Sequence, residues 1–180
     1  MADQLSRLTH KLDALTAADC EIARQWRNTD EVRLGFRTPY MLTEEMQASF
    51  YRDVVCNRNA PHRYWAVRDE AGAFVALAGL SFIQWENGLA EISLDVDPAR
   101  RNQGIGADAV ELVLREGFKR MRLLRVVGEV YNHNPGRAFW LRMVERFHGQ
   151  TCFSPRGKFW NGELHDATAF YFEADRWRTE

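Results

Sequence analysis

The residues with the clearest chemical potential lie at 95–107, where the chain reads Asp-Val-Asp-Pro-Ala-Arg-Arg-Asn-Gln-Gly-Ile-Gly-Ala. Gly104 and Gly106 lack a Cβ, so the backbone there can take positive φ and approach a bound group, and two arginines just before them add positive charge. An apolar alternating segment, 90–96, precedes this run, and an amphipathic segment, 107–121, follows it. The first turn of a helix has N–H groups without intrahelical partners and the positive end of the helix dipole. The pattern therefore predicts a strand, a loop and a helix start that bind an anion, most readily phosphate.

Two other phosphate-binding motifs can be compared with this loop. Gly104 to Ala109 matches the dinucleotide pattern G-x-G-x-x-G/A, and Glu129 lies near the end of a later apolar run, where a ribose-binding acid is expected. In that pattern the first glycine follows its strand almost directly, whereas residues 98–103 intervene here, and too little chain follows for a second mononucleotide half. A loop of the G-x-x-x-x-G-K-[ST] type does not occur, because no Lys-Ser/Thr follows Gly106. A nicotinamide-dinucleotide-binding oxidoreductase is therefore the less favoured alternative.

The hexapeptide Arg-Asn-Gln-Gly-Ile-Gly at 101–106 resembles the [RQ]-x-x-G-x-[GA] signature of the Gcn5-related N-acetyltransferase (GNAT) superfamily. In that superfamily the loop binds the pyrophosphate of acetyl-coenzyme A, so the resemblance implies acetyl-CoA as the acetyl donor and no metal ion. The coenzyme-binding residues that it implies are Arg101, Asn102, Gln103, Gly104, Ile105, Gly106 and Ala107 in the loop, with Leu94, Asp95 and Val96 in the preceding strand and Asn134 and Arg137 further on. One amide of the strand would polarise the thioester carbonyl, while Asn134 could equally serve as a helix cap.

Acyl transfer from a thioester to an amine needs a neutral amine, a donor for the developing oxyanion and a proton source for the leaving thiolate. Glu91 and Glu129 are the two candidate bases, because a carboxylate partly buried between strands has a raised pKa suited to this work. Glu91 is slightly favoured, since its strand faces the acceptor cleft in the family. Either residue could instead be a strand-edge carboxylate that faces solvent or pairs with an arginine.

The proton donor is the point at which the chain departs from its relatives. Many family members carry a tyrosine in a stretch resembling A-I-x-L-Y-E-K-x-G-F, and the corresponding run, 138–147, places Arg142 or Leu141 at that position. Either the thiolate leaves without an acid, or Tyr131 or another residue supplies the proton. The departure also motivates a second alternative, a non-catalytic acyl-CoA-binding or sensing domain.

The acceptor is predicted to lie against the loop between the first two helices. By analogy with the family, the residues that line this wall are Arg33, Phe36, Arg37 and Tyr40. Cationic and aromatic side chains suit a phosphorylated or sugar-nucleotide acceptor, although they could equally hold the loop against the core. The sequence leaves open an amino sugar nucleotide, a protein N-terminus or a small amine.

Composition limits the other classes of function. With 180 residues, 46% of them hydrophobic, the chain suits one well-cored domain over 1–180. A formal net charge of −1 provides no general attraction to nucleic acid or to an anionic membrane, and no apolar run approaches a membrane span. Three widely separated cysteines predict reduced thiols in a soluble, cytoplasmic protein, and the histidines lack metal-ligand spacing. A homodimer is a possible assembly.

Periodicity and turn residues predict the order of the elements. The expected strands are 12–15, 64–67, 74–80, 89–96 and 125–130, with two more in 151–172 around Asn161-Gly162; the expected helices are about 17–26, 43–57, 107–121 and 135–147, and 28–39 is expected to be a loop. Strands 89–96 and 125–130 are expected to be parallel across the intervening helix.

This order is that of the GNAT superfamily over essentially the whole chain. It implies an α/β fold with a single mixed, largely antiparallel sheet, a V-shaped splay between two parallel central strands, and flanking helices. The segments 26–33 and 162–166 also resemble the branch that contains ribosomal-protein N-terminal acetyltransferases and acetyltransferases of amino-sugar nucleotides. We therefore expect an enzyme that transfers acetyl directly from acetyl-CoA to a primary amine.

Overall fold

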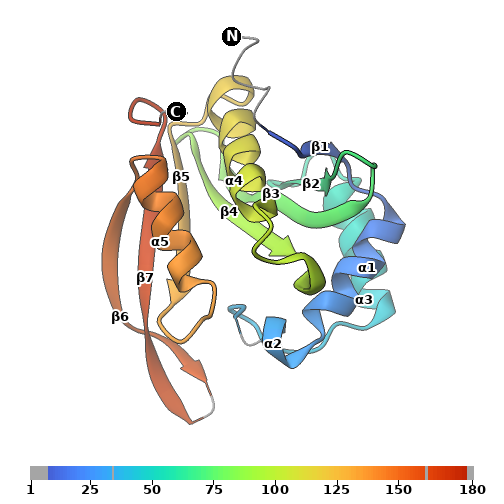
Figure 1. Cartoon of the computed structure of the whole chain (residues 1–180), viewed down its shortest axis with the longest axis horizontal. Coiled ribbons are helices and arrows are strands. Elements are labelled where there is room, and N and C mark those ends of the chain that lie inside the picture. The colour runs from blue at the N-terminus through green and yellow to red at the C-terminus, as the bar shows by residue number, and fades with distance from the viewer. Residues whose placement is uncertain (1–7, 34, 161, 178–180) are drawn as a thin grey trace.

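The computed structural model describes residues 8–33, 35–160 and 162–177. Within these ranges seven strands form one sheet in the order β1-β2-β3-β4-β5-β7-β6 (Figure 1). The strands are β1 (Lys11–Ala14), β2 (Arg63–Arg68), β3 (Phe74–Gln84), β4 (Leu89–Val96), β5 (Arg125–Tyr131), β6 (Gln150–Trp160) and β7 (Glu163–Glu173). The helices are α1 (Ala17–Arg27), α2 (Asp30–Arg33), α3 (Glu44–Phe50), α4 (Ile105–Arg115) and α5 (Arg137–Arg146), with π-helical turns η2 (Tyr51–Val55) and η4 (Glu116–Arg120) continuing α3 and α4 and a 3-10 turn η3 (Pro98–Arg100) after β4.

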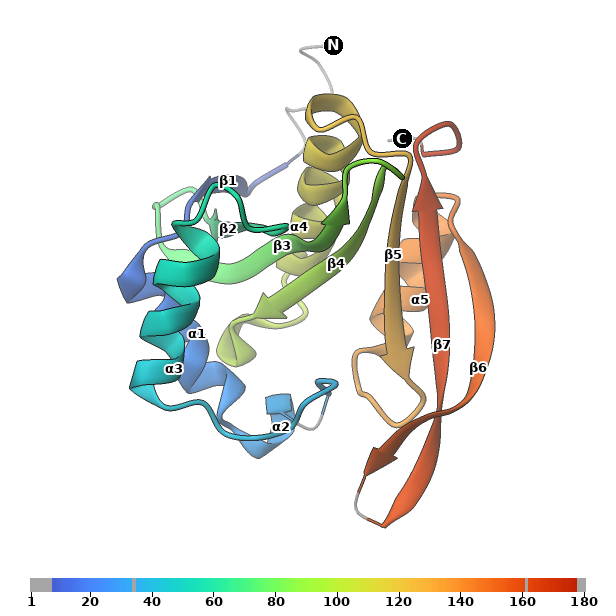
Figure 2. The same ribbon diagram turned by 180° about the vertical axis from the view of Figure 1, so that it is seen from behind.

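The helices cover the sheet on both faces (Figures 1 and 2). Helices α4 and α5 lie on one face, where Val110, Val113 and Val144 pack with strand residues such as Val126 in the larger core. Helices α1 and α3 lie on the other face, over a smaller core that contains Cys20 and its neighbours. Since alternate residues of a strand point to opposite faces, each strand supplies both cores.

The two central parallel strands diverge. Strands β4 and β5 pair only over residues 89–91 and 125–127, and their remaining residues separate toward the carboxyl ends (Figure 2). All other strand pairs of the sheet are antiparallel. The predicted fold class, a mixed sheet with a V-shaped splay between two parallel strands, is therefore confirmed. A doubly wound dinucleotide fold, which needs a run of parallel strands, is not formed.

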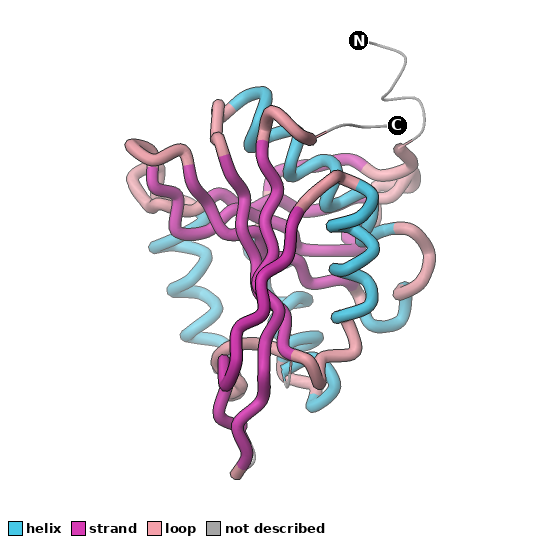
Figure 3. The backbone as a smooth tube through the Cα atoms, turned by 90° about the vertical axis from the view of Figure 1, so that its left-hand side faces the viewer, coloured by secondary structure: helices cyan, strands magenta, loops and turns pink. Residues whose placement is uncertain are grey.

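Strands β6 and β7 form a long hairpin whose turn extends beyond the rest of the molecule (Figure 3). Its buried face was ambiguous from the sequence, and the structure resolves this, because Phe170 and Phe172 are buried whereas Phe159 is exposed. The predicted turn at 161–162 is observed at Gly162, while Asn161 lies outside the described residues.

Local signals explain where the first helix starts. Thr16 caps α1 in a full capping box, in which the Thr16 hydroxyl accepts from the amide of Asp19 and the Asp19 carboxylate accepts from the amide of Thr16. Asp19 is buried and also accepts from Arg68 at 2.7 Å, and these hydrogen bonds lower its pKa although burial alone would raise it. The cap therefore also joins the first helix to the sheet.

Two predicted boundaries were wrong. The segment 28–39 was expected to be a loop, but it contains the single turn α2, which is too short to show a hydrophobic period. The helix expected from Pro135 starts at Arg137, because Asn134 forms a turn in which its Oδ1 accepts from the amide of Gly136 at 2.7 Å.

Candidate active site

The glycine loop leaves room beside its backbone. Gly104 is the N-cap of α4, with φ +84° and no side-chain hydrogen bond to the helix. A Cβ added at Gly104 would meet nothing within 4 Å, so the space is open. Asn102 also has positive φ, +63°. Helix α4 therefore begins beside open space, which is where an anion bound to a helix N-terminus would lie.

Gly106 has a different role, which is close packing. A Cβ there would lie 3.1 Å from two ring atoms of Phe139 on α5 and 3.7 Å from Leu94 on β4. The first turn of α4 thus lies between β4 and α5, beside the point where β4 and β5 separate. The predicted loop and the splay belong to one region of the molecule.

Ion pairs hold the loop in position. Arg100 donates to Asp69, in the turn between β2 and β3, at 2.7 Å, and this hydrogen bond is the largest cause lowering the pKa of Asp69. Arg101 pairs with Glu31 of α2. The two arginines therefore connect the loop to two other segments, in addition to the predicted contact of Arg101 with the coenzyme.

Asp95 is the carboxyl group with the most perturbed titration in this region. Burial raises its pKa to about 7, although the nearby cations Arg27 and Arg101 act in the opposite direction. The guanidinium of Arg27 stacks 4.0 Å from the centroid of the Phe36 ring, and within the described chain its buried Nε has no hydrogen-bond partner. From the sequence, Asp95 was predicted only as a coenzyme contact in the strand, and no pattern indicated Arg27.

The three predicted catalytic residues lie on the same sheet face. Glu91 on β4 accepts from Nη2 of Arg37 at 2.9 Å. Arg37 also interacts with Tyr131 on β5, and Glu129, two residues before Tyr131, is close enough to raise the pKa of the Tyr131 hydroxyl further. Burial is the largest cause of that raised pKa. Arg37 therefore connects β4 and β5 across the splay.

Lys158 of the long hairpin lies over the ring of Tyr131. Its Nζ is 4.5 Å from the centroid of the Tyr131 ring and donates to the carbonyl oxygen of Phe36 at 2.5 Å. Lys158 is only 6% exposed, and this burial lowers its pKa. Lys158 was not predicted from the sequence, because nothing local distinguishes a lysine in an apolar, aromatic strand from one at a solvent-facing position.

Two histidines continue the aromatic contacts of Tyr131. His133 stacks on the Tyr131 ring with 6.0 Å between centroids, and His165 lies 4.3 Å from His133. In the described ranges no group of three histidine, cysteine or acidic side chains could hold a metal ion. Nor do the described helices include one with the length and apolar character needed to cross a bilayer.

The predicted acceptor residues separate into two groups. Arg33 bonds Asp30 at 2.8 Å and the carbonyl of Pro39 at 3.0 Å, which orders the loop itself. Phe36 packs under Arg27, and Tyr40 is 55% exposed. Arg37 differs from these three, because its guanidinium bonds the predicted base Glu91.

Asn134 and Arg137, the remaining predicted coenzyme contacts, lie at the turn before α5. Nδ2 of Asn134 donates to the carbonyl of Gly35 at 3.1 Å, and Nε of Arg137 donates to Asn132 at 3.2 Å. Asn134 therefore does cap the turn before the helix, and it also joins α5 to the acceptor-side loop. Because only Nε of Arg137 is used in the bond to Asn132, the other donors of its guanidinium can bind a ligand.

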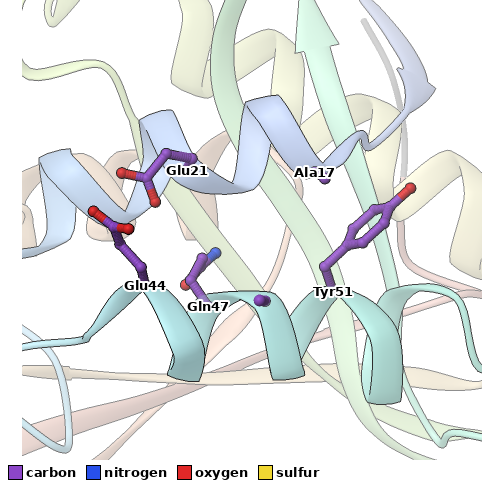
Figure 4. Close-up of a pocket in the computed structure, with 6 residues that line it drawn as sticks. Ala17, Glu21, Glu44, Gln47 and Tyr51 are labelled. Atoms are coloured by element: carbon purple, nitrogen blue, oxygen red, sulfur yellow. The ribbon is translucent and has the colours of Figure 1, made fainter.

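A separate pocket lies between α1 and α3 (Figure 4). It is lined by Ala17, Glu21, Glu44, Gln47, Ala48 and Tyr51. Arg24 already pairs with both carboxylates of this pocket. None of the predicted site residues lines it, so we assign the chemistry to the splay and not to this pocket.

With this geometry established, the chain can be compared with known proteins. The family model described as acetyltransferase (GNAT) domain matches residues 10–139. The chain belongs to the GNAT acetyltransferase family. It is accordingly an acyltransferase, an N-acetyltransferase that uses acetyl-CoA, as the glycine loop and the order of elements predicted. No curated protein sequence matches it significantly.

Solved structures share the GNAT fold. Spermidine N-acetyltransferase from Vibrio cholerae in complex with CoA and spermine has a TM-score of 0.82 at 19% identity, with 93% of this chain and 97% of that chain covered. Spermidine/spermine N-acetyltransferase from Vibrio cholerae in complex with manganese ions has a TM-score of 0.75 at 18% identity, with coverages of 93% and 94%. At these identities the similarity shows the fold alone, and the resemblance to the ribosomal-protein and amino-sugar-nucleotide branch stays a prediction.

Proposed function

We propose that this GNAT acetyltransferase transfers acetyl directly from acetyl-CoA to a primary amine, with both substrates bound in the splay between β4 and β5. The observation that carries the proposal is the position of Gly106, which contacts β4 through Leu94 and α5 through Phe139. The open first turn of α4 is thereby placed beside strands that stop pairing after Glu91 and Val127. A binding site for the phosphates and a slot for an extended arm therefore adjoin each other.

The described residues fit the coenzyme. Gly104 leaves open space for a pyrophosphate beside the amides of the first turn of α4, and Arg137 lies across the splay as a further donor. The β4 backbone from Leu94 to Val96, beyond the last pair with β5, has groups available to an amide-containing arm. The Vibrio cholerae relative of the same fold was solved with CoA, which supports this placement.

Acetyl-CoA supplies a thioester, from which the amine nitrogen displaces the thiol as the C–N bond forms and the C–S bond breaks. The amine must first lose its ammonium proton, and Glu91 and Glu129 are the candidate acceptors because they lie on the same sheet face as Tyr131. A tyrosine is protonated at neutral pH, and burial raises the pKa of Tyr131 further, so its hydroxyl has a proton to donate to the leaving sulfur. Once the C–N bond has formed, the nitrogen loses its second proton, which returns to the oxygen of Tyr131.

The acceptor is an amine that reaches Glu91 and Tyr131 past the loop between α1 and α3. An amino sugar nucleotide, a protein N-terminus and a small amine all present a primary amine of this kind. The alternative motivated by the missing tyrosine in α5, a non-catalytic acyl-CoA sensor, does not agree with the family to which the chain belongs. Turnover of an amine is the direct test between the two.

The decisive experiment is calorimetric titration with acetyl-CoA, run beside NAD. Gly104→Glu fills the open space with a carboxylate and should weaken binding at least about a hundredfold through repulsion and bulk. Gly72→Glu is the matched control, because Gly72 also has positive φ, +83°, and open space around its Cβ position, but lies in the turn between β2 and β3. Equal losses in both variants, or no binding to the wild type, would contradict the proposal.

A further inference from the structure

The charge arrangement around Glu91 suggests what kind of amine the site accepts. Glu91 is paired with Arg37, and the Arg37 side chain is 55% exposed whereas that of Glu91 is 29% exposed. A guanidinium has five donors in a planar fork that matches a carboxylate or a phosphate. Its exposed donors therefore remain accessible to a ligand while one bonds Glu91.

The pair with Arg37 also occupies Glu91. Nη2 of Arg37 lies 2.9 Å from Oε1 of Glu91, so an ammonium group that approaches this oxygen must displace the guanidinium. The pair is partly exposed, and ion pairs in contact with solvent are weak. A ligand anion can therefore compete for Arg37 and free Glu91.

A second cation lies on the same side of the splay. Lys158 Nζ is 4.5 Å from the Tyr131 ring, and Arg37 interacts with the same tyrosine. The acidic groups that β4 and β5 place on this face are Glu91, which Arg37 pairs, Asp95, which lies near Arg27 and Arg101, and Glu129. Two cations beside the reacting position favour an acidic group on the acceptor and disfavour a polycation.

On the basis of the proposed function, we propose that the acceptor is a primary amine that also carries a phosphate or carboxylate, and that this acid binds Arg37 and releases Glu91 to take the ammonium proton. Arg37 is then the specificity-determining residue, and the acceptor activates its own base. This substrate class differs from the polyamines for which the related Vibrio cholerae enzymes are named.

The test uses pairs of amines that differ only in the acid. O-phosphoethanolamine with ethanolamine and glucosamine 6-phosphate with glucosamine test phosphate, γ-aminobutyrate with butylamine tests carboxylate, and spermidine is the polycation. Release of free thiol from acetyl-CoA is measured for each. The wild type should prefer the acidic member of at least one pair about tenfold or more in kcat/KM, and which pair does so distinguishes phosphate from carboxylate.

Arg37→Gln tests whether Arg37 recognises the acid of the acceptor or is needed for turnover of every amine. For the acidic amine, kcat/KM should fall about tenfold to a hundredfold, mainly through KM, because a charge-assisted contact is lost. For the neutral amine of the same pair, kcat should rise, because Glu91 is no longer paired. Arg37→Lys should recover part of the preference, and Arg52→Gln, which removes a guanidinium from the exposed pair with Asp53, serves as the charge control.

The outcomes distinguish this inference from the proposed function. If acetyl-CoA binds but no amine is acetylated, the proposed function fails and this inference fails with it. If amines are acetylated but the wild type prefers spermidine or the neutral members, this inference alone is wrong. An equal loss for both members of a pair in Arg37→Gln would also overturn it, since Arg37 would then be needed for turnover and not for recognition of an acid.

Discussion

Nζ of Lys158 on β6 donates to the carbonyl oxygen of Phe36 over 2.5 Å, although 122 positions separate the two residues in the chain. This bond joins the long C-terminal hairpin to the loop between α1 and α3. Nδ2 of Asn134 makes a second bond to that loop, at the carbonyl of Gly35. Two bonds from the β5 side of the splay therefore hold the segment that carries Arg37, and Arg37 itself bonds Glu91 on the β4 side.

The first prediction concerns this loop. Lys158→Met keeps much of the buried side-chain volume but removes the donor, so the backbone amides of residues 35–38 and 40 should exchange with deuterium about tenfold faster, as local opening becomes easier. Hydrogen exchange followed by mass spectrometry measures this. Lys119→Met, at an exposed position on η4, should leave the loop unchanged. If exchange at 35–40 stays at the wild-type rate, the bond does not order the loop.

The second prediction assigns the base. Glu91→Gln should lower kcat about a hundredfold at neutral pH, because general-base catalysis contributes roughly that much or more, whereas Glu129→Gln should lower it less than about tenfold. Binding of acetyl-CoA should persist in both. Steady-state kinetics with the preferred amine provides the comparison, and Glu145→Gln on α5 is the control. The reverse order of effects would transfer the role to Glu129.

The third prediction concerns the proton donor. Tyr131→Phe keeps the stacking on His133 but removes the hydroxyl, so kcat should fall about tenfold to a hundredfold while acetyl-CoA binding is kept. Because burial raises the pKa of Tyr131, ionisation of this group should reduce the wild-type rate only above about pH 10. Tyr171→Phe removes a hydroxyl that bonds Gln150 instead, and should leave kcat unchanged. An undiminished kcat in Tyr131→Phe would mean that the thiolate leaves without this acid.

The fourth prediction concerns stability and pH. The folded protein holds the Asp95 proton up to about pH 7, whereas an unfolded aspartic acid releases it near 3.8. Between these values the folded state binds more protons, so this carboxyl makes the free energy of unfolding fall as pH rises from about 4 to about 7, with no further change above. Asp95→Asn mimics the neutral form and should be more stable than the wild type by about 1–3 kcal/mol at pH 8, with no difference near pH 4.

Urea denaturation without acetyl-CoA at both pH values tests the Asp95 prediction. Asp53→Asn is the matched control, because Asp53 is an exposed carboxylate paired with Arg52. A stability difference between Asp95→Asn and the wild type that is the same at pH 4 and pH 8 would show that Asp95 titrates normally.

Local patterns were sufficient for most of the fold. Strand β4, the glycine loop and α4 follow from alternation, glycine placement and a helical period, all of which act between near neighbours in the chain. The helical turn α2 was predicted as part of a loop, because a single turn has too few residues to show a hydrophobic period. The start of α5 depended on whether Asn134 would bond the amide of Gly136, and Pro135 alone does not decide that.

The sequence by itself determined the family, the glycine loop and the order of the elements, because each depends on residues close together in the chain. Only the tertiary structure decided that Arg37 pairs with Glu91, 54 positions away, and that Lys158 lies beside Tyr131. Such contacts depend on where the sheet splays and where a loop and a hairpin fold back. Those positions are set by packing of the whole core, which no local pattern encodes.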